Sequence, residues 1–402
     1  MDGAKISKIM LHIGDIKTAS TSIQATLYHN IIPQKHARKY HYLRSWFENH
    51  SFALFISTTE FSPFKFSLAG TKYDKSRETY KDLLWNELKT CYVETLVLSA
   101  EMMSEFTKEA HHAVKNLLME LGDPKLLTIQ LVGYVRDPIA SLTSAFQTYA
   151  CYLHYSETDI DSSSERLSST SPIESMAEVF GMEQIKLHKF EDAIQHEYGP
   201  VGFFYENFLA FTREDISRLD IKKKNESMSQ IAVDLCCFIN AAAPMYDKNH
   251  KPTGLRKRFD LALIRISISG PKFKLSKDNR YKHLYRCEEK INYLKITFGI
   301  HYSYEKMKEA IDSDIEPSHI PTKQNLSEID SIFYKVHSVI QDCIISYLQQ
   351  LTHSLDEDDE LLFVVNQLIL RLTKKKKTVF NKIFLFKQAV MRRLRVNAQP
   401  PV

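Results

Sequence analysis

The stretch LHIGDIKTASTSIQATL, Leu11 to Leu27, decides the fold, because a short apolar run meets a glycine and then a hydroxyl-rich helical pattern. A phosphate-binding loop of the Walker type reads Gly, four residues, then Gly-Lys-Ser/Thr. Here Gly14 precedes Lys17 by three positions, and no second glycine follows. Three interpretations are open: a degenerate nucleotide loop, a different cradle for an anion, or a plain turn from a strand into a helix.

Apolar patterning on both sides of this stretch predicts an α/β fold. Residues 8–13 resemble a short buried strand, and spacings of three and four after Ser20 predict a helix that ends before Pro33. Further strands are predicted over residues 94–101, 126–138 and 184–191, with helical patterns between them. Such alternation implies right-handed βαβ crossovers. We therefore expect a P-loop-like central parallel sheet flanked by helices, with a mainly helical C-terminal extension.

The chain of 402 residues is longer than one compact domain needs. We expect an α/β domain over residues 1–270, a helical extension over 271–370 and a basic amphipathic tail over 371–402. Residues 156–175 are rich in serine and lack an apolar period, so they are interpreted as a loop that could cover a site.

The excess of basic over acidic residues in the chain comes from the predicted C-terminal tail. Residues 371–395 hold ten of the 53 Lys and Arg and no acidic residue, so the other 43 basic residues face 49 acidic ones. A nucleic-acid partner is therefore not expected. Residues 374–395 predict contact with an anionic membrane, since Lys and Arg flank an apolar helical stripe. The alternative is a helix docked on the acidic body near residues 356–360.

Cysteine usage and hydropathy point to the cytoplasm. The six cysteines include no Cys-x-x-Cys pair, which argues against a zinc site or a disulfide framework. The apolar run before Gly14 is too short for a signal peptide, and no run approaches transmembrane length. We expect a cytoplasmic protein, peripheral at the membrane if the tail binds lipid.

Two motifs carry the candidate chemistry. In the first, KTASTS, one cation and four hydroxyls stand where a strand becomes a helix, so helix N–H groups and the helix dipole would favour a phosphate there. Ordinary helix capping by Ser or Thr is an equally good explanation of this motif alone. The second, YVRDPIASLTS, places Arg136 at the end of a buried strand and Ser144 two helical turns later. That pair could hold one phosphate from two sides.

Together these motifs resemble the sulfotransferase superfamily, whose donor is 3′-phosphoadenosine 5′-phosphosulfate (PAPS). In that family a strand-loop-helix with Lys and Ser/Thr binds the 5′-phosphosulfate, and a later Arg with a Ser eight residues on binds the 3′-phosphate. The resemblance implies a 5′ loop made by Lys17, Thr18, Ala19, Ser20, Thr21 and Ser22. It implies a 3′ pair made by Arg136 and Ser144. Ala19 stands where the family usually has glycine.

The resemblance also implies an activity. The pattern is closer to bacterial and Golgi carbohydrate sulfotransferases, so the expected acceptor is a hydroxyl of a carbohydrate or glycolipid. Lys17 would stabilise the departing phosphate, and no metal is expected. Glu101, at the end of the strand before the one bearing Arg136, matches the family's catalytic base, and His50 is a second candidate. Asn225 and Ser227 resemble a late Asn-x-Ser element near the nucleotide.

Each of these assignments has an alternative. Glu101 could be an acid that only favours a helix dipole, a lone histidine such as His50 is more often structural, and Ser227 could be a helix cap. At the level of the whole chain, the rivals are a P-loop-like kinase that uses a nucleoside triphosphate and a non-catalytic nucleotide-binding protein. Mg²⁺ dependence of transfer would identify the kinase, and donor binding without turnover would identify the binding protein.

Overall fold

The computed structural model describes residues 6–14, 18–30, 39–46, 48–58, 77–89, 93–152, 160–222, 227–247, 251–257, 259–356, 359–374 and 376. The chain divides into two compact units. Unit 1 comprises residues 1–145, 160–226 and 275–315, and unit 2 comprises residues 146–159, 227–274 and 316–402. The expected domain limits at residues 270 and 370 stay a prediction.

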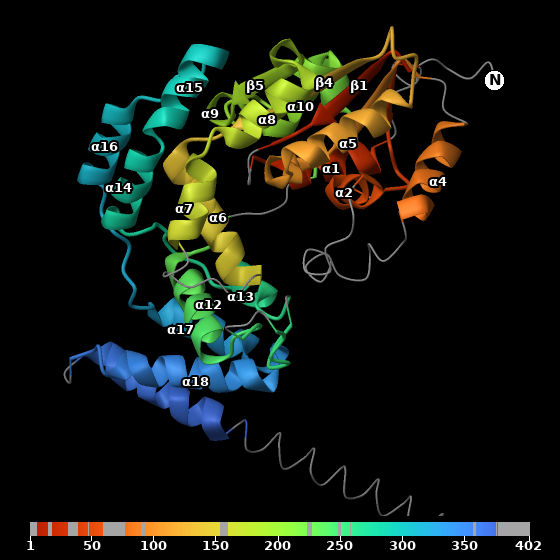
Figure 1. The fold of residues 1–402 in the computed structure, drawn as a ribbon. Helices are drawn as coiled ribbons and strands as arrows, with labels where there is room; N and C mark the ends of the chain where they lie inside the picture. The colour runs from red at the N-terminus through yellow and green to blue at the C-terminus, as the bar shows by residue number, and fades with distance from the viewer. Residues whose placement is uncertain are drawn as a thin grey trace, which may run out of the picture. The chain divides into compact units, whose positions relative to one another are not determined.

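Unit 1 is built on a parallel sheet, as the sequence predicts (Figure 1). Its five strands are β1 Lys8–His12, β2 Tyr40–Tyr42, β3 Thr95–Ser99, β4 Thr128–Val135 and β5 Ile185–Lys189, in the order β2-β3-β1-β4-β5. β1 lies between β3 and β4, and its last residue, His12, pairs with Ser99 on one side and Val132 on the other. The carboxyl ends of β1, β3 and β4 therefore reach the same edge of the sheet.

Helices cover both faces of this sheet. Ile9, Leu11 and Leu131 face one side, where they pack in one core with α2 Ser51–Thr58, α4 Arg77–Leu88, α5 Lys108–Met119 and α8 Ser171–Phe180. Met10 and Val132 face the other side, where they pack with α1 Ser20–His29 and α10 Gly199–Leu209. Residues in these strands alternate between two apolar cores, which explains their nearly continuous hydrophobic runs.

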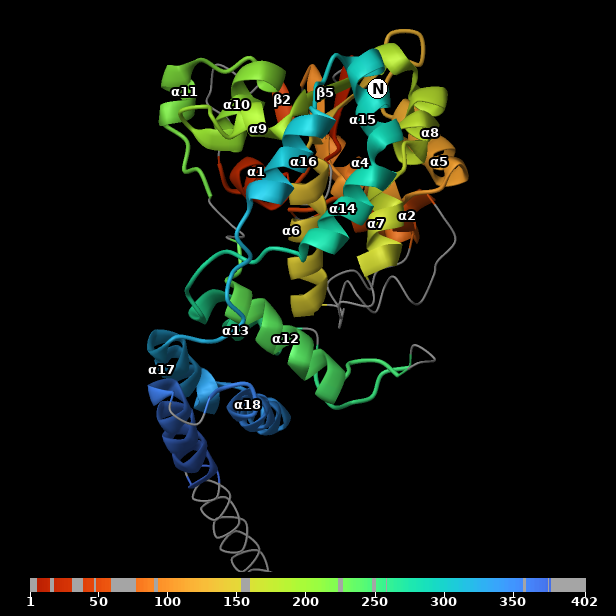
Figure 2. The same cartoon turned by 90° about the vertical axis from the view of Figure 1, so that its left-hand side faces the viewer.

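Further helices of unit 1 pack near the end of β4. α14 Lys277–Arg286, α15 Glu288–Phe298 and α16 Tyr304–Ser313 form a core that includes Val135, and the three lie together in Figure 2. The shorter elements of unit 1 are η2 Glu101–Glu105, η4 Met182–Gln184, α9 Phe190–Ala193 and α11 Arg213–Ser217. α6 Pro138–Tyr152 begins in unit 1 and continues into unit 2.

The loop interpretation of residues 156–175 is wrong from residue 160 onward. The structure forms α7 Ile160–Ser168 there, followed by α8 from Ser171. Ile160, Ser163, Ser164 and Leu167 are buried at helical spacing, so small serines replace apolar residues on the packed face. The Ser164 hydroxyl is 2.8 Å from Nδ1 of the buried His283 on α14. Residues 156–159 lie outside the described part of the chain.

Unit 2 is helical. It contains α12 Gln230–Ala242, α13 Ala262–Ser267, α17 Lys323–Ile332, η5 Phe333–Lys335, α18 Ser338–Thr352 and helical residues 360–374. α12 contacts α18, and α13 contacts α17. At the start of the predicted tail, within the described residues, Arg371 pairs with Asp330 at 2.9 Å, and Lys376 pairs with Asp342 of α18. Most of the predicted tail helix lies outside the described residues. Among the helices that the structure describes, none has the length and apolar character needed to cross a membrane.

Gly133 of β4 lets the chain turn where β1 ends. The Ile13 N–H donates to the Val132 carbonyl at 2.7 Å, which carries the β1–β4 pairing one residue past His12. A Cβ on Gly133 would then lie 1.7 Å from the carbonyl oxygen of Ile13, so no larger residue fits without moving backbone. This close approach sets the path of the chain into Gly14.

We predict that Gly133→Ala lowers the free energy of unfolding by about 3 kcal/mol or more, because the clash is with backbone and not with a movable side chain. Chemical denaturation measures the loss. Gly254→Ala is a matched control, since Gly254 has a φ of 73° but nothing within 4 Å of the added Cβ. That control should cost only the strain of a left-handed alanine, about 1–2 kcal/mol. A Gly133→Ala protein as stable as the control would contradict this explanation.

Candidate functional site

The predicted site residues of unit 1 follow the carboxyl ends of neighbouring parallel strands. The loop with Gly14 follows β1, Glu101 begins η2 after β3, and Arg136 follows β4. Open α/β sheets bind ligands at this edge. The sheet order therefore brings the predicted 5′ loop between the predicted base and the predicted 3′ arginine.

The N-cap residue of α1 is an alanine, so a Ser or Thr at the N-cap does not explain the hydroxyl run. This residue is Ala19, and it makes no side-chain hydrogen bond to the helix. The first N–H groups of a helix have no intrahelical partner, so this end of α1 keeps donors available for an anion. Ala19 has a φ of 63° and a ψ of 13°, which is the left-handed conformation normally taken by glycine. The alanine thus adopts a backbone conformation that glycine takes without strain.

Three of the four hydroxyl residues of this loop are buried. Thr18, Ser20 and Ser22 are each less than a tenth exposed. The Ser20 hydroxyl has no hydrogen-bond partner among the residues that the structure describes. A Cβ on Gly14 would lie 2.8 Å from Thr18 Oγ1 and 2.9 Å from Ser20 Oγ, so the two hydroxyls close over the glycine. Lys17 lies outside the described residues, and its position stays a prediction.

Arg136 leaves β4 beside an aromatic ring. Its guanidinium carbon is 5.3 Å from the centroid of the Phe190 ring, within the range of a cation–π contact. Asp137 caps α6, because its carboxylate accepts from the Ala140 N–H at 2.9 Å. Burial raises the pKa of Asp137 above its usual value, with the neighbouring Glu191 adding to the shift. The helix start after Arg136 is therefore confirmed as Asp137-Pro138.

Glu191 fixes the backbone beside Arg136. Its Oε1 accepts from the Asp137 N–H at 3.0 Å, and its Oε2 accepts from the Tyr302 hydroxyl at 2.9 Å. The Tyr302 hydroxyl also lies 3.0 Å from the Val135 carbonyl. Glu191 thereby links the residues that follow β4 to the segment that precedes α16, which is a positioning role.

Ser144 lies on α6, half-buried, within unit 1 as Arg136 does. Ser141 precedes it by three residues and so shares its helix face. The Ser141 hydroxyl is buried and unpartnered among the described residues, a feature that sequence reasoning missed. The signal was available, since Ser141 lies one helical turn before Ser144 in the quoted motif.

The two candidate bases differ in their surroundings. Glu101 is partly exposed, and Asn49 Nδ2 donates to its Oε1 at 3.3 Å. His50 is fully buried, and its ring stacks on Tyr42 with 4.7 Å between centroids. Its Nδ1 accepts from the Ser99 N–H at 3.0 Å, and its Nε2 lies 2.8 Å from the Leu43 carbonyl. Proton acceptance by His50 would require breaking a backbone bond, so the catalytic proposal rests on Glu101.

The late Asn-x-Ser element is only partly described. Asn225 lies outside the described residues, although the nearby Lys222 N–H donates to Thr26 Oγ1 of α1 at 3.1 Å. Ser227 is exposed and belongs to unit 2. It does not cap the following helix, because Ser229 is the N-cap of α12 and accepts from the Ala232 N–H.

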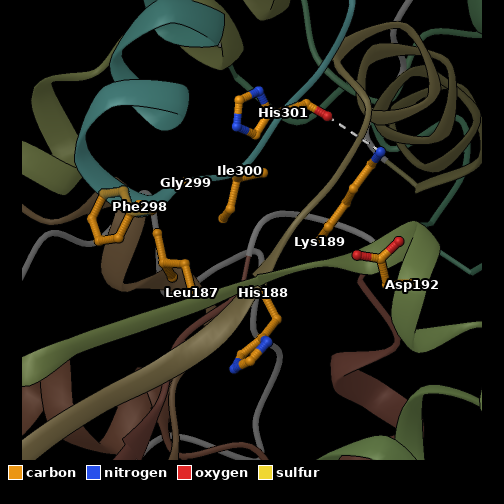
Figure 3. Close-up of a pocket in the computed structure, with 8 residues that line it drawn as sticks. All are labelled: Leu187, His188, Lys189, Asp192, Phe298, Gly299, Ile300 and His301. Atoms are coloured by element: carbon orange, nitrogen blue, oxygen red, sulfur yellow. Dashed lines mark hydrogen bonds between the residues drawn. The ribbon is translucent and has the colours of Figure 1, made fainter.

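A pocket of about 430 Å³ lies elsewhere in unit 1, beside the edge strand β5 (Figure 3). It is lined by Leu187, His188, Lys189, Asp192, Phe298, Gly299, Ile300 and His301. Lys189 Nζ donates to the His301 carbonyl at 3.3 Å and lies 4.9 Å from the centroid of the Tyr302 ring. None of the predicted site residues that the structure describes lines this pocket. Its lysine already serves to join β5 to the chain before α16, so we place the candidate site at the strand ends instead.

Comparison with known proteins gives weak likenesses. No protein-family model matches the chain, and no curated protein matches it in sequence. Among solved structures, a sulfotransferase from Alicyclobacillus acidocaldarius matches with a TM-score of 0.35 and 14% identity, over 54% of this chain and 85% of that one. A retinol dehydratase solved with androsterone and inactive cofactor PAP matches with a TM-score of 0.34 and 13% identity, over 74% of this chain and 83% of that one. Likenesses this distant carry no information about the chemistry of the site.

We predict that Ala19→Gly raises the free energy of unfolding by about 1 kcal/mol, because glycine adopts a positive φ without the clash that alanine suffers. Ala210→Gly is a matched control away from the loop. Ala210 has a φ of 51° at the C-cap of α10, so it should give a similar gain. Denaturation of both variants measures the effect. A loss of stability in Ala19→Gly would show that the left-handed geometry of the loop is wrong.

Proposed function

We propose that this chain is a sulfotransferase that moves a sulfuryl group from PAPS to a hydroxyl group of a carbohydrate or glycolipid. One observation carries the proposal: the uncapped end of α1 meets a buried Ser20 hydroxyl that has no hydrogen-bond partner among the described residues. A buried polar group without a partner costs roughly 1–3 kcal/mol. An anion bound at the helix N-terminus would remove that cost and gain the helix dipole.

The donor would span the ends of two adjacent strands. Its 5′-phosphosulfate would bind the first N–H groups of α1, the hydroxyls of Thr18, Ser20, Thr21 and Ser22, and Lys17. Its 3′-phosphate would bind Arg136 after β4, with Ser144 as the second ligand. The Phe190 ring beside the Arg136 guanidinium restricts that side chain before the donor arrives, which reduces the entropy lost on binding.

The transfer step needs little covalent chemistry from the protein. The acceptor oxygen forms a bond to sulfur while the bond between sulfur and the bridging oxygen of the 5′-phosphate breaks. Glu101 takes the proton of the acceptor hydroxyl, and adenosine 3′,5′-bisphosphate (PAP) departs. Lys17 and the N-terminal dipole of α1 stabilise the negative charge that develops on the departing phosphate. The bond from Asn49 would orient Glu101 toward the acceptor.

The acceptor class rests on the motif resemblance to carbohydrate sulfotransferases. A transfer assay with PAPS against a panel of glycans and glycolipids tests it, with phenols and steroids as the contrasting acceptors. Transfer from a nucleoside triphosphate in a Mg²⁺-dependent reaction would instead identify a kinase. Liposome binding by the full-length chain tests the separate proposal that residues 374–395 contact an anionic membrane. The cytoplasmic address also stays a proposal.

We predict that PAP binds at least about ten times more tightly than AMP, because hydrogen bonds to a charged group contribute about 1.5–3 kcal/mol each. Arg136→Ala should remove this preference and leave AMP affinity nearly unchanged. Isothermal calorimetry gives both affinities. Arg218→Ala is the control. Arg218 is an exposed arginine directly after α11, where it pairs with Glu214. Equal affinities for PAP and AMP in the unmutated protein would refute the proposed donor.

We predict that Glu101→Gln slows transfer by roughly 10²–10⁴-fold and keeps PAP affinity, because an amide preserves the shape but cannot accept the proton. Steady-state rates with PAPS and a confirmed acceptor provide the test. Glu109→Gln, at an exposed position of α5, should keep the full rate. If Glu101→Gln kept that rate as well, another group would have to be the base.

A further inference from the structure

His12 is a polar residue at the end of a buried strand. It is the last residue of β1 and is fully buried, on the sheet face that carries α1 and α10. Its ring packs edge-on against Phe204 of α10 with 5.1 Å between centroids. A histidine in such a position normally has both ring nitrogens bonded within the fold, as His50 does.

One nitrogen of His12 is bonded and the other is not. Nδ1 lies 2.7 Å from the hydroxyl of Ser99, the residue that pairs with His12 across β1 and β3. Nε2 is buried and has no hydrogen-bond partner in the described part of the chain. The ring therefore directs an unpaired polar atom into a region that excludes water.

The partners of Ser99 favour one of the two positions of the ring proton. Gln24 Nε2 of α1 donates to the Ser99 hydroxyl oxygen at 3.1 Å. The hydroxyl can then give its own proton to Nδ1 of His12, which leaves the ring proton on Nε2. Burial also lowers the pKa of His12 to about 3, so the ring stays neutral near pH 7. In this tautomer His12 presents a neutral N–H donor at Nε2.

Nε2 lies beside the same glycine as the loop hydroxyls. A Cβ on Gly14 would lie 3.7 Å from His12 Nε2 and 2.9 Å from Ser20 Oγ. These two atoms are both buried and both unpartnered among the described residues. Two independent polar atoms, one from β1 and one from α1, are therefore left unsatisfied at one place, next to the uncapped helix end.

We propose that His12 Nε2 donates a hydrogen bond to the anionic end of the donor bound at the N-terminus of α1, and that Ser99 and Gln24 hold its ring in the required tautomer. This inference rests on the proposed function, because it names a further ligand of the 5′-phosphosulfate. His12 is a binding residue, whereas Ser99 and Gln24 are positioning residues. A neutral donor adds a directed bond without adding a second charge beside Lys17.

Two substitutions of His12 distinguish the roles of its two ring nitrogens. Asn in place of His12 can keep a group near Nδ1 but has nothing at the position of Nε2, whereas Gln reaches that position with its amide. We expect His12→Asn to weaken PAP binding about tenfold, because it loses one hydrogen bond to a charged group. His12→Gln should weaken binding only about threefold, because its amide partly restores that bond. Calorimetry with PAP measures both. Affinity unchanged in folded His12→Asn would overturn the inference.

A measurement on the unmutated protein avoids any effect of substitution on folding. With histidine-selective ¹⁵N labelling, and His12→Gln to identify the resonance, NMR should show the His12 proton on Nε2 in the free protein and a shift of that signal on adding PAP. Ser99→Ala should reduce the Nε2–H population, which a merely structural role would not predict. A proton on Nδ1, or a signal insensitive to bound PAP, would refute the proposed role of His12 and leave the proposed function standing. If the protein does not bind PAP, the proposed function fails, and this inference fails with it.

Discussion

The parallel hydrogen bonding of β1 to both β3 and β4 is the constraint on which the site depends. It sets His12 opposite Ser99 and Val132, so the chain segments after the three strands begin at one edge of the sheet. Gly133 then permits the chain after β1 to turn close over β4 toward Gly14. A shift of one residue in either pairing would reverse which side chains face each core and would separate the loop from Arg136.

The structure at the N-terminal end of α1 lowers the stability of the free protein. Ala19 occupies a left-handed conformation, and the Ser20 hydroxyl and His12 Nε2 are buried without partners among the described residues. Strain and unsatisfied polar groups persist in folded proteins mainly where function requires them. Their concentration at an uncapped helix N-terminus is physically consistent with a site that is completed when an anion binds.

The sequence predicts four of the five strands of the sheet, but it does not predict the details of the site. The predicted strands over residues 94–101 and 126–138 are confirmed, because strands buried on both faces are long apolar runs. The sequence pattern does not predict β2, since Tyr40–Tyr42 is only three residues long. The sequence pattern predicts a loop where α7 forms, because the buried face of this helix uses serines. The role of His12 depends on which atoms lie near Nε2, which is a matter of tertiary packing that the pattern of residues does not contain.

A structure of the protein with PAP bound would test the central claim most directly. The account predicts the 5′-phosphate at the start of α1, with one of its oxygens within hydrogen-bond distance of the Ser20 hydroxyl and another phosphate beside Arg136. A nucleotide bound at the pocket lined by Lys189 and His301, with Ser20 still unpaired, would contradict the account.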